Sequence, residues 1–228
     1  MKIDKEFVEK VFNKPRVIGI IADISEGKTM TACNLIDSLV KDFKCDIRLH
    51  GFRCYPQEVQ FHSLEELESF ENKIIFIDEF YSLFDLENRK KVKEIETTLR
   101  LINHRNNILV LIGTAENFKK FISNKLDMIL FKKTTIGECI NGSKVKNVLT
   151  SYNGPGTGVT ALRLNKNECL FYDGLKYNLL EIDYIESKDT KKDNIPLISC
   201  EKILCENVSE NVESKSKEMK GGINDDKD

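Results

Sequence analysis

The chain has 228 residues, of which 40% are hydrophobic, and its formal net charge at pH 7 is −2. This length is enough to bury one substantial core with a small appendage. A charge so close to zero excludes a globally basic nucleic-acid coat, although it leaves room for a localised basic channel. No apolar stretch approaches the roughly 18 residues of a membrane-spanning helix, and the amino terminus lacks the apolar segment of a secretory signal. We therefore expect a soluble, cytoplasmic protein with no transmembrane segment.

The seven cysteines are scattered along the chain, without a Cys-x-x-Cys pair, and only three histidines are present. This distribution argues against both a disulfide framework and a zinc cluster. We expect reduced and mostly buried thiols, as is usual in a reducing cytosol.

Strands and helices are expected to alternate along the first 131 residues. Apolar runs predict strands at 17–21, 47–52, 73–78, 107–113 and 127–131. Apolar residues at three- and four-residue steps predict helices at 29–43, 63–70, 86–104 and 117–123, the second of them opened by a capping box of Ser63 and Glu66. The alternation predicts an α/β fold, in which a parallel sheet is flanked by helices on both faces.

The character of the chain changes after residue 133. Short runs at 145–152, 159–164 and 169–172 surround a glycine-rich loop at 153–158, and we interpret them as strands of β-hairpins. Beyond residue 186 the chain is rich in Lys, Glu, Asp and Ser, a composition typical of disorder. We therefore divide the chain into a core at 1–134, a β-rich extension at 135–185 and a disordered charged tail at 186–228.

The first expected strand leads into Ala22-Asp-Ile-Ser-Glu-Gly-Lys-Thr29, which matches the phosphate-binding loop (Walker A) of P-loop NTPases except at its first position. Backbone N–H groups and the helix dipole at the start of the following helix favour phosphate oxygens. Lys28 would bring a positive charge to the β- and γ-phosphates, Thr29 a hydroxyl to Mg²⁺, and Gly27 a close backbone approach. The expected nucleotide-binding residues are Ala22, Asp23, Ile24, Ser25, Glu26, Gly27, Lys28, Thr29 and Met30.

Three residues of this loop replace small residues that are usual there. Ala22 stands in place of glycine, which is tolerable if its backbone is ordinary and costly if the loop needs a left-handed residue. Ser25 and Glu26 also depart from the pattern. Glu26 would put a carboxylate close to the triphosphate unless its side chain points outward.

The segment Ile74-Ile-Phe-Ile-Asp78-Glu79 is a hydrophobic strand that ends in two acids, the Walker B form. Asp78 is expected in the coordination shell of magnesium, and Glu79 is expected to orient and deprotonate the attacking water. Each motif alone has an ordinary structural interpretation, as a helix start or as a solvated strand end. Their occurrence in this order predicts an ATPase that binds ATP and Mg²⁺, with Lys28 and Glu79 as catalytic residues.

Two further groups of residues are candidates for the same chemistry. Thr114 and Glu116 follow the strand at 107–113 and are candidates for sensing the γ-phosphate, although a helix-capping role for Thr114 is an equal alternative. Three arginines between the acidic pair and this strand are candidates for an arginine finger that acts across a subunit boundary. They are Arg89, Arg100 and Arg105, of which we prefer Arg105 as the catalytic one, the alternative for each being a surface residue.

Taken together, these motifs, with Asp85 and Arg89 after the acidic pair and Ile102-Asn-His-Arg105 before the next strand, resemble the FtsK–HerA superfamily over residues 15–133. Within it, the small genome-packaging ATPases of tailless viruses and the ATPase domains of zonula-occludens-toxin-like morphogenesis proteins are most similar. The toxin-like proteins carry a membrane span after this domain, so the absence of one here favours the packaging type. Glu116 stands where that group usually has glutamine.

The resemblance implies a hexameric ring of identical subunits that moves double-stranded DNA, with nucleotide between subunits and the arginine finger supplied by the neighbour. It also implies capsid or membrane-associated viral proteins as partners, and a place in the host cytoplasm or the virion. Lys90, Lys91 and Lys93, or Lys132 and Lys133, are candidates for DNA contact, with a solvated surface as the alternative.

Two other function classes remain open. An AAA+-type loader or remodeller would add a helical lid after the fifth strand. A non-hydrolysing nucleotide-binding switch is favoured by the departures in the phosphate-binding loop.

Overall fold

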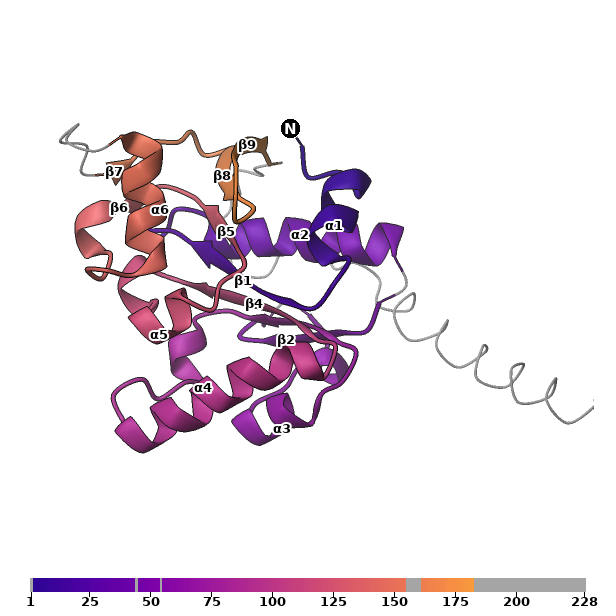
Figure 1. The fold of residues 1–228 in the computed structure, drawn as a ribbon. Coiled ribbons are helices and arrows are strands. Elements are labelled where there is room, and N and C mark those ends of the chain that lie inside the picture. Colours follow the sequence, from indigo (N-terminus) through magenta and orange to yellow (C-terminus); the bar gives the residue numbers. More distant parts are fainter. Residues whose placement is uncertain (1, 44, 54, 155–160, 183–228) are drawn as a thin grey trace, which may run out of the picture.

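A computed structural model describes residues 2–43, 45–53, 55–154 and 161–182 of the chain. Its main sheet is built from β1 (Arg16–Ile21), β2 (Ile47–His50), β3 (Ile74–Ile77), β4 (Ile108–Gly113), β5 (Met128–Phe131), β8 (Glu168–Tyr172) and β9 (Tyr177–Glu181). These seven strands lie in the order β2-β3-β4-β1-β5-β8-β9 (Figure 1). The five from β2 to β5 are parallel, and β8 and β9 are antiparallel additions. The predicted α/β fold is therefore confirmed.

Helices cover both faces of the sheet. One face carries α1 (Lys5–Phe12) and α2 (Lys28–Asp42), and the other carries α3 (Leu64–Ser69), α4 (Arg89–His104), α5 (Lys120–Ser123) and α6 (Lys144–Asn153) (Figure 1). Successive residues of a strand point to opposite faces. In β1, Ile18 and Ile20 therefore enter the core under α1 and α2, whereas Val17 and Ile21 enter the core on the other face.

The strand order decides where the functional motifs meet. β4 lies between β1 and β3, and the three strands run parallel in register, with Ile21 opposite Gly113 and Ile77 opposite Leu111. The segments that follow β1, β3 and β4 therefore meet at one edge of the sheet, which we call the carboxyl edge. Crevices at this edge are where parallel α/β sheets bind ligands.

The prediction of a hairpin strand at 145–152 is wrong, because this segment forms most of helix α6. Val145, Val148 and Leu149 are buried at helical spacing, and Ser143 caps the helix by accepting a hydrogen bond from the N–H of Lys146 at 3.2 Å. The β-branched and aromatic residues of this segment favour a strand by composition. Its apolar period of three and four residues is the stronger signal.

The strand predicted at 169–172 is confirmed as β8, and it pairs with β5. Residues 161–182 therefore continue the main sheet, except for β7 (Ala161–Leu162), which pairs with β6 (Thr134–Thr135) in a separate ribbon. The helix predicted at 117–123 is reduced to a 3-10 turn at Ala115–Asn117 and one α-helical turn, α5.

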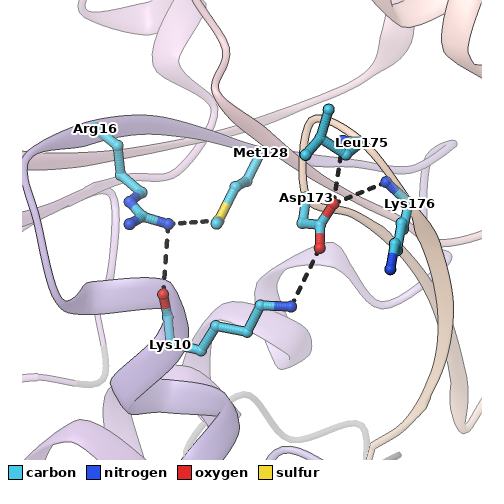
Figure 2. Close-up of polar contacts among 6 residues, drawn as sticks. All are labelled: Lys10, Arg16, Met128, Asp173, Leu175 and Lys176. Atoms are coloured by element: carbon cyan, nitrogen blue, oxygen red, sulfur yellow. Dashed lines mark hydrogen bonds and ion pairs between the residues drawn. The ribbon is translucent and has the colours of Figure 1, made fainter.

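Helix α1 and strand β9 were not predicted from the sequence. Polar contacts join α1 to the turn that precedes β9 (Figure 2). The ammonium of Lys10 on α1 lies 3.1 Å from Asp173 Oδ2, in the turn between β8 and β9. Although burial opposes it, hydrogen bonds from the backbone N–H groups of Lys176 and Leu175, and from Lys10, lower the pKa of Asp173. The buried Arg16 donates to the carbonyl of Lys10 at 3.5 Å.

The described cysteines are free thiols, and Cys33, Cys139 and Cys169 among them are buried. Burial raises the pKa of Cys139 to about 11 and that of Cys169 to about 12, so both are neutral at physiological pH. In the described ranges, no helix combines the length and the apolar character needed to cross a membrane. The charged tail predicted at 186–228 and most of the loop predicted at 153–158 lie outside the described residues.

Candidate functional site

The phosphate-binding loop connects the carboxyl end of β1 to the amino end of the 15-residue helix α2, as predicted. Left-handed backbone occurs at Ser25 (φ 63°) and Gly27 (φ 83°) and not at Ala22. The Ala22 N–H donates to the carbonyl of Gly113 at 3.3 Å, which ties the start of the loop to β4. Ala22 is therefore a tolerable replacement for glycine, and the strained position is Ser25, where a side chain costs about 1 kcal/mol.

The two motifs predicted from the sequence, the Walker A form and the Walker B form, are in direct contact. Thr29 Oγ1, in the first turn of α2, donates a hydrogen bond to Asp78 Oδ2 at 2.8 Å, immediately after β3. Asp78 is 7% exposed, and burial raises the pKa of its carboxyl group, while Thr29 and the charge of Lys28 act in the opposite direction. A positive partner would relieve the cost of this buried carboxylate. The structure thus places the residues predicted for phosphate and metal binding side by side.

Glu79, the predicted general base, is exposed and has a left-handed backbone (φ 47°, ψ 50°). Its backbone carbonyl accepts a hydrogen bond from the N–H of Ser82 at 2.8 Å, which fixes the turn. A non-glycine residue in this conformation costs of order 1 kcal/mol, and such strain is concentrated at functional sites. Glu79 thus stands at the carboxyl edge, directly after the buried Asp78, with its own side chain exposed.

Tyr81, two residues after Glu79, is affected by the charges of acidic residues that follow two strands. Desolvation raises the pKa of the Tyr81 hydroxyl, and the charges of Glu79, Asp78 and Glu116 add to this effect. Glu116 follows β4, whereas Asp78 and Glu79 follow β3. The segments after β3 and β4 therefore both place acidic groups near Tyr81, and the sensor role of Glu116 stays a prediction.

Thr114 occupies the amino-terminal position of the turn at Ala115–Asn117, but its side chain makes no capping hydrogen bond to the backbone. Its hydroxyl instead accepts from Asn117 Nδ2 at 2.8 Å and lies 3.4 Å from Glu116 Oε1. The helix-capping alternative is thus wrong for this side chain. Asn117 was not singled out from the sequence, although an amide three residues after a strand-end threonine is a recognisable signal.

Residues 133–135, which follow β5, contact the phosphate-binding loop from the side. Asp23 accepts hydrogen bonds from the Thr135 N–H at 2.9 Å and from the Thr135 hydroxyl at 2.7 Å. Glu26 forms an ion pair with Lys133, with 2.6 Å between Oε1 and Nζ. Sequence reasoning missed these partners, because they lie more than 100 positions away along the chain.

Gly51, which follows β2, is packed against the Walker B backbone. Its φ is +84°, and a Cβ at this position would lie 2.9 Å from the carbonyl oxygen of Asp78. The Asp78 N–H also donates to the carbonyl of His50 at 2.9 Å. No side chain fits at residue 51 without displacing Asp78, so glycine here is needed for the backbone after β2 to pass close to Asp78.

We expect Gly51→Ala to lower the free energy of unfolding by about 2–3 kcal/mol, because it combines a left-handed backbone with a steric clash. Urea denaturation followed by circular dichroism measures this. Gly137→Ala is the matched control: nothing lies within 4 Å of a Cβ placed there, and it is not among the positive-φ glycines. It is expected to change stability by less than about 0.5 kcal/mol. Equal effects of the two substitutions would contradict the assigned role of Gly51.

Arg105 does not lie at this site. Its carbonyl accepts from the N–H of Asn72 at 3.0 Å, just before β3, so it is at the opposite edge of the sheet. The six residues of β4 separate it from Thr114 by roughly 20 Å, at about 3.3 Å per residue. Arg105 therefore cannot reach a nucleotide bound to its own subunit.

Lys132 and Lys133, the pair after β5 that was predicted as a candidate for DNA contact, differ from each other in exposure. Lys132 is 2% exposed, and its ammonium donates to the carbonyls of Lys166 and Glu168. Burial lowers its pKa. The prediction of DNA contact is therefore wrong for Lys132, whereas Lys90, Lys91 and Lys93 of α4 are exposed.

The donor set at the site fits a magnesium ion. The Thr29 hydroxyl and the Asp78 carboxylate are hard oxygen ligands 2.8 Å apart, and Mg²⁺ in NTPases is usually held by one or two protein oxygens together with phosphate and water. The described residues contain no group of three or more His, Cys, Asp or Glu side chains arranged for a metal. These residues therefore fit a metal held jointly with a triphosphate.

Comparison with solved structures identifies the fold. The genome-packaging NTPase B204 from Sulfolobus turreted icosahedral virus 2, in complex with sulfate, superposes with a TM-score of 0.53 at 13% identity, over 75% of this chain and 99% of that chain. B204 from Sulfolobus turreted icosahedral virus, a DNA-packaging ATPase, gives a TM-score of 0.52 at 14% identity, over 75% and 100% of the two chains. The chain has the fold of the viral genome-packaging ATPases.

The predicted resemblance to packaging ATPases is thus confirmed at the level of the fold. A complex of the virus 2 protein with the ATP analogue AMPPCP matches with a TM-score of 0.50 at 12% identity, over 73% of this chain and 96% of that chain. No family model matches the sequence, and no curated protein matches it. The identities are too low to transfer individual residue roles, so these roles rest on the geometry of the site.

Proposed function

We propose that this chain is an ATP-hydrolysing, DNA-translocating motor that packages or transfers the genome of a virus or mobile element. The observation that carries the proposal is the 2.8 Å hydrogen bond between Thr29 Oγ1 and Asp78 Oδ2. It brings the end of the phosphate-binding loop and the Walker B acid to one point at the carboxyl edge of the sheet. The fold shared with DNA-packaging ATPases supports the direction of the proposal.

Each residue at the carboxyl edge has a distinct task in this proposal. Lys28 and the backbone N–H groups at the start of α2 bind the phosphate oxygens of ATP. Thr29 and Asp78 would hold Mg²⁺, which would neutralise charge on the triphosphate. Glu79 orients the attacking water and accepts its proton, and Thr114 with Glu116 detects the γ-phosphate.

A neighbouring copy of the chain completes the site in this proposal, within a hexameric ring. Ile24 in the phosphate-binding loop is 77% exposed and Tyr81 is 42% exposed, and both lie at the carboxyl edge. A second subunit placed over this edge would remove these large apolar surfaces from water. Arg105 lies at the opposite edge of the sheet, so it would serve as an arginine finger only on the nucleotide of a neighbour.

The test is the rate of ATP hydrolysis with and without double-stranded DNA at low salt. We expect DNA to stimulate hydrolysis several-fold. Replacement of Lys90, Lys91 and Lys93 together by Ala is expected to abolish the stimulation while leaving the basal rate unchanged, because these exposed side chains on α4 would contact phosphates. A hydrolysis rate that is indifferent to DNA would contradict the motor.

Two alternatives are separated from the motor by simple observations. An AAA+-type loader would carry a helical lid after the fifth strand, whereas the described part of 135–182 has one α-helix, α6, among short strands. A non-hydrolysing switch would bind ATP with Mg²⁺ in isothermal titration without releasing phosphate in a turnover assay.

A further inference from the structure

Two carboxylates stand within the loop that has to receive a polyanionic triphosphate. They are Asp23 and Glu26, and Glu26 replaces a small residue that is usual at its position. Like charges repel over the short distances of such a loop, with an energy that rises as water is excluded. A phosphate-binding loop with uncompensated carboxylates would therefore bind nucleotide weakly.

Both carboxylates are engaged by one short segment that follows β5. Asp23 is fixed by two hydrogen bonds from Thr135, at 2.9 and 2.7 Å, and its own N–H donates to the carbonyl of Lys133 at 2.9 Å. Glu26 is held by the ammonium of Lys133 at 2.6 Å. The hydrogen bond and the charge of Glu26 raise the pKa of Lys133. The segment thus contacts the loop at two residues. Asp23 is held by hydrogen bonds from the uncharged Thr135, and Glu26 is held by an ion pair with Lys133.

The two adjacent lysines point in different directions, which explains why only Lys133 neutralises the charge of Glu26. Lys132 points into the protein, where its ammonium binds the carbonyls of Lys166 and Glu168. Lys133, the next residue, lies at a bend of the chain between β5 and β6, and its ammonium is turned to the phosphate-binding loop instead. It therefore meets Glu26, and half of its side chain remains exposed.

We infer that Lys133 is a positioning residue for the nucleotide, because it neutralises Glu26 and holds this carboxylate to the side of the phosphate-binding loop. The inference rests on the proposed nucleotide site and names a residue outside the Walker motifs on which that site depends. Lys133 acts through Glu26 and does not itself contact phosphate. Its substitution should therefore matter only while residue 26 carries a negative charge.

The test is a double-mutant cycle on the dissociation constant for ATP, measured by isothermal titration with Mg²⁺ at 50 mM salt. Lys133→Ala is expected to raise this constant roughly tenfold, because it leaves the Glu26 carboxylate unpaired beside the triphosphate. Lys133→Arg, which keeps the charge, is expected to stay within about threefold of the unmodified protein. The double variant Glu26→Gln/Lys133→Ala is expected to return to within about twofold, since no carboxylate is left to neutralise.

Salt dependence separates charge compensation from a merely structural role. At 500 mM salt the screening length falls to about 4 Å, so the loss caused by Lys133→Ala is expected to shrink to threefold or less. Lys176→Ala is the matched control, because this exposed lysine lies in the turn between β8 and β9. Thermal unfolding of each variant checks that it is folded.

Two outcomes overturn the inference. One is an unchanged dissociation constant in Lys133→Ala. The other is a loss of ATP affinity from Lys133→Ala that is equally large whether residue 26 is Glu or Gln. That result would assign Lys133 a direct contact with phosphate or a structural role. Failure of the proposed function looks different, because the unmodified protein would then bind ATP without hydrolysing it, or would not bind it at all. Absence of binding overturns both.

Discussion

Glu79→Gln is expected to lower the rate of ATP turnover at least 100-fold while changing the dissociation constant for ATP less than threefold. Glutamine has nearly the same shape as glutamate but cannot accept the proton of the attacking water. A positioned general base typically contributes a factor of about 10²–10⁴ to the rate. The Glu79 side chain is exposed, and the turn at Glu79 is held by a backbone hydrogen bond. The substitution should therefore leave the fold and the phosphate-binding residues intact.

The measurement is steady-state phosphate release at saturating ATP, with binding followed separately by titration. Glu87→Gln is the matched control, because Glu87 is also exposed and lies a few residues further along the chain. It is expected to keep the unmodified rate. A Glu79→Gln variant with more than a tenth of that rate would show that another group activates the water, and Glu116 would be the first candidate to examine.

Much of this site was predictable because its parts are short, local patterns that the topology then brings together. The sequence Gly27-Lys28-Thr29 predicts a helix start, and the apolar run before Asp78 predicts a buried strand. Parallel strands place the segments after them at the same edge. The contact between Thr29 and Asp78 therefore follows once β1 and β3 lie on either side of β4 in the sheet.

The lateral support of the site was not predictable from such patterns. Lys133 and Thr135 meet Glu26 and Asp23 only because β5 pairs with β1 in the folded sheet. Gly51 is needed because the chain after β2 passes close to the carbonyl of Asp78. Neither fact leaves a periodic or compositional signal, since both depend on the distance between segments far apart in sequence.

The errors in the fold have a similar origin. In residues 145–152, strand-favouring residue types competed with a helical apolar period, and burial on the sheet decided for the helix. Helix α1 is only eight residues long, and a helix of this length depends on tertiary packing for its stability. That packing comes from Phe7 against Phe171, with ring centroids 5.1 Å apart.

Lys28→Met is expected to raise the dissociation constant for ATP by roughly 10²–10³-fold. A hydrogen bond to a charged group contributes about 1.5–3 kcal/mol, and in the proposed site the Lys28 ammonium would bind two phosphates. A loss of about 3–4 kcal/mol corresponds to this factor. Methionine keeps the length of the side chain and a good helix propensity, so the stability of α2 should be nearly unchanged.

Lys41→Met provides the matched control, because Lys41 is an exposed lysine in the last turn of the same helix. It removes the same charge from α2 at the end remote from the phosphates, and we expect it to leave the dissociation constant within about twofold. Titration of both variants with ATP and Mg²⁺ therefore separates a local phosphate contact from the general effect of net charge. If both substitutions weakened binding equally, Lys28 would act only through the overall charge of the protein, and the loop before α2 would no longer be the phosphate site.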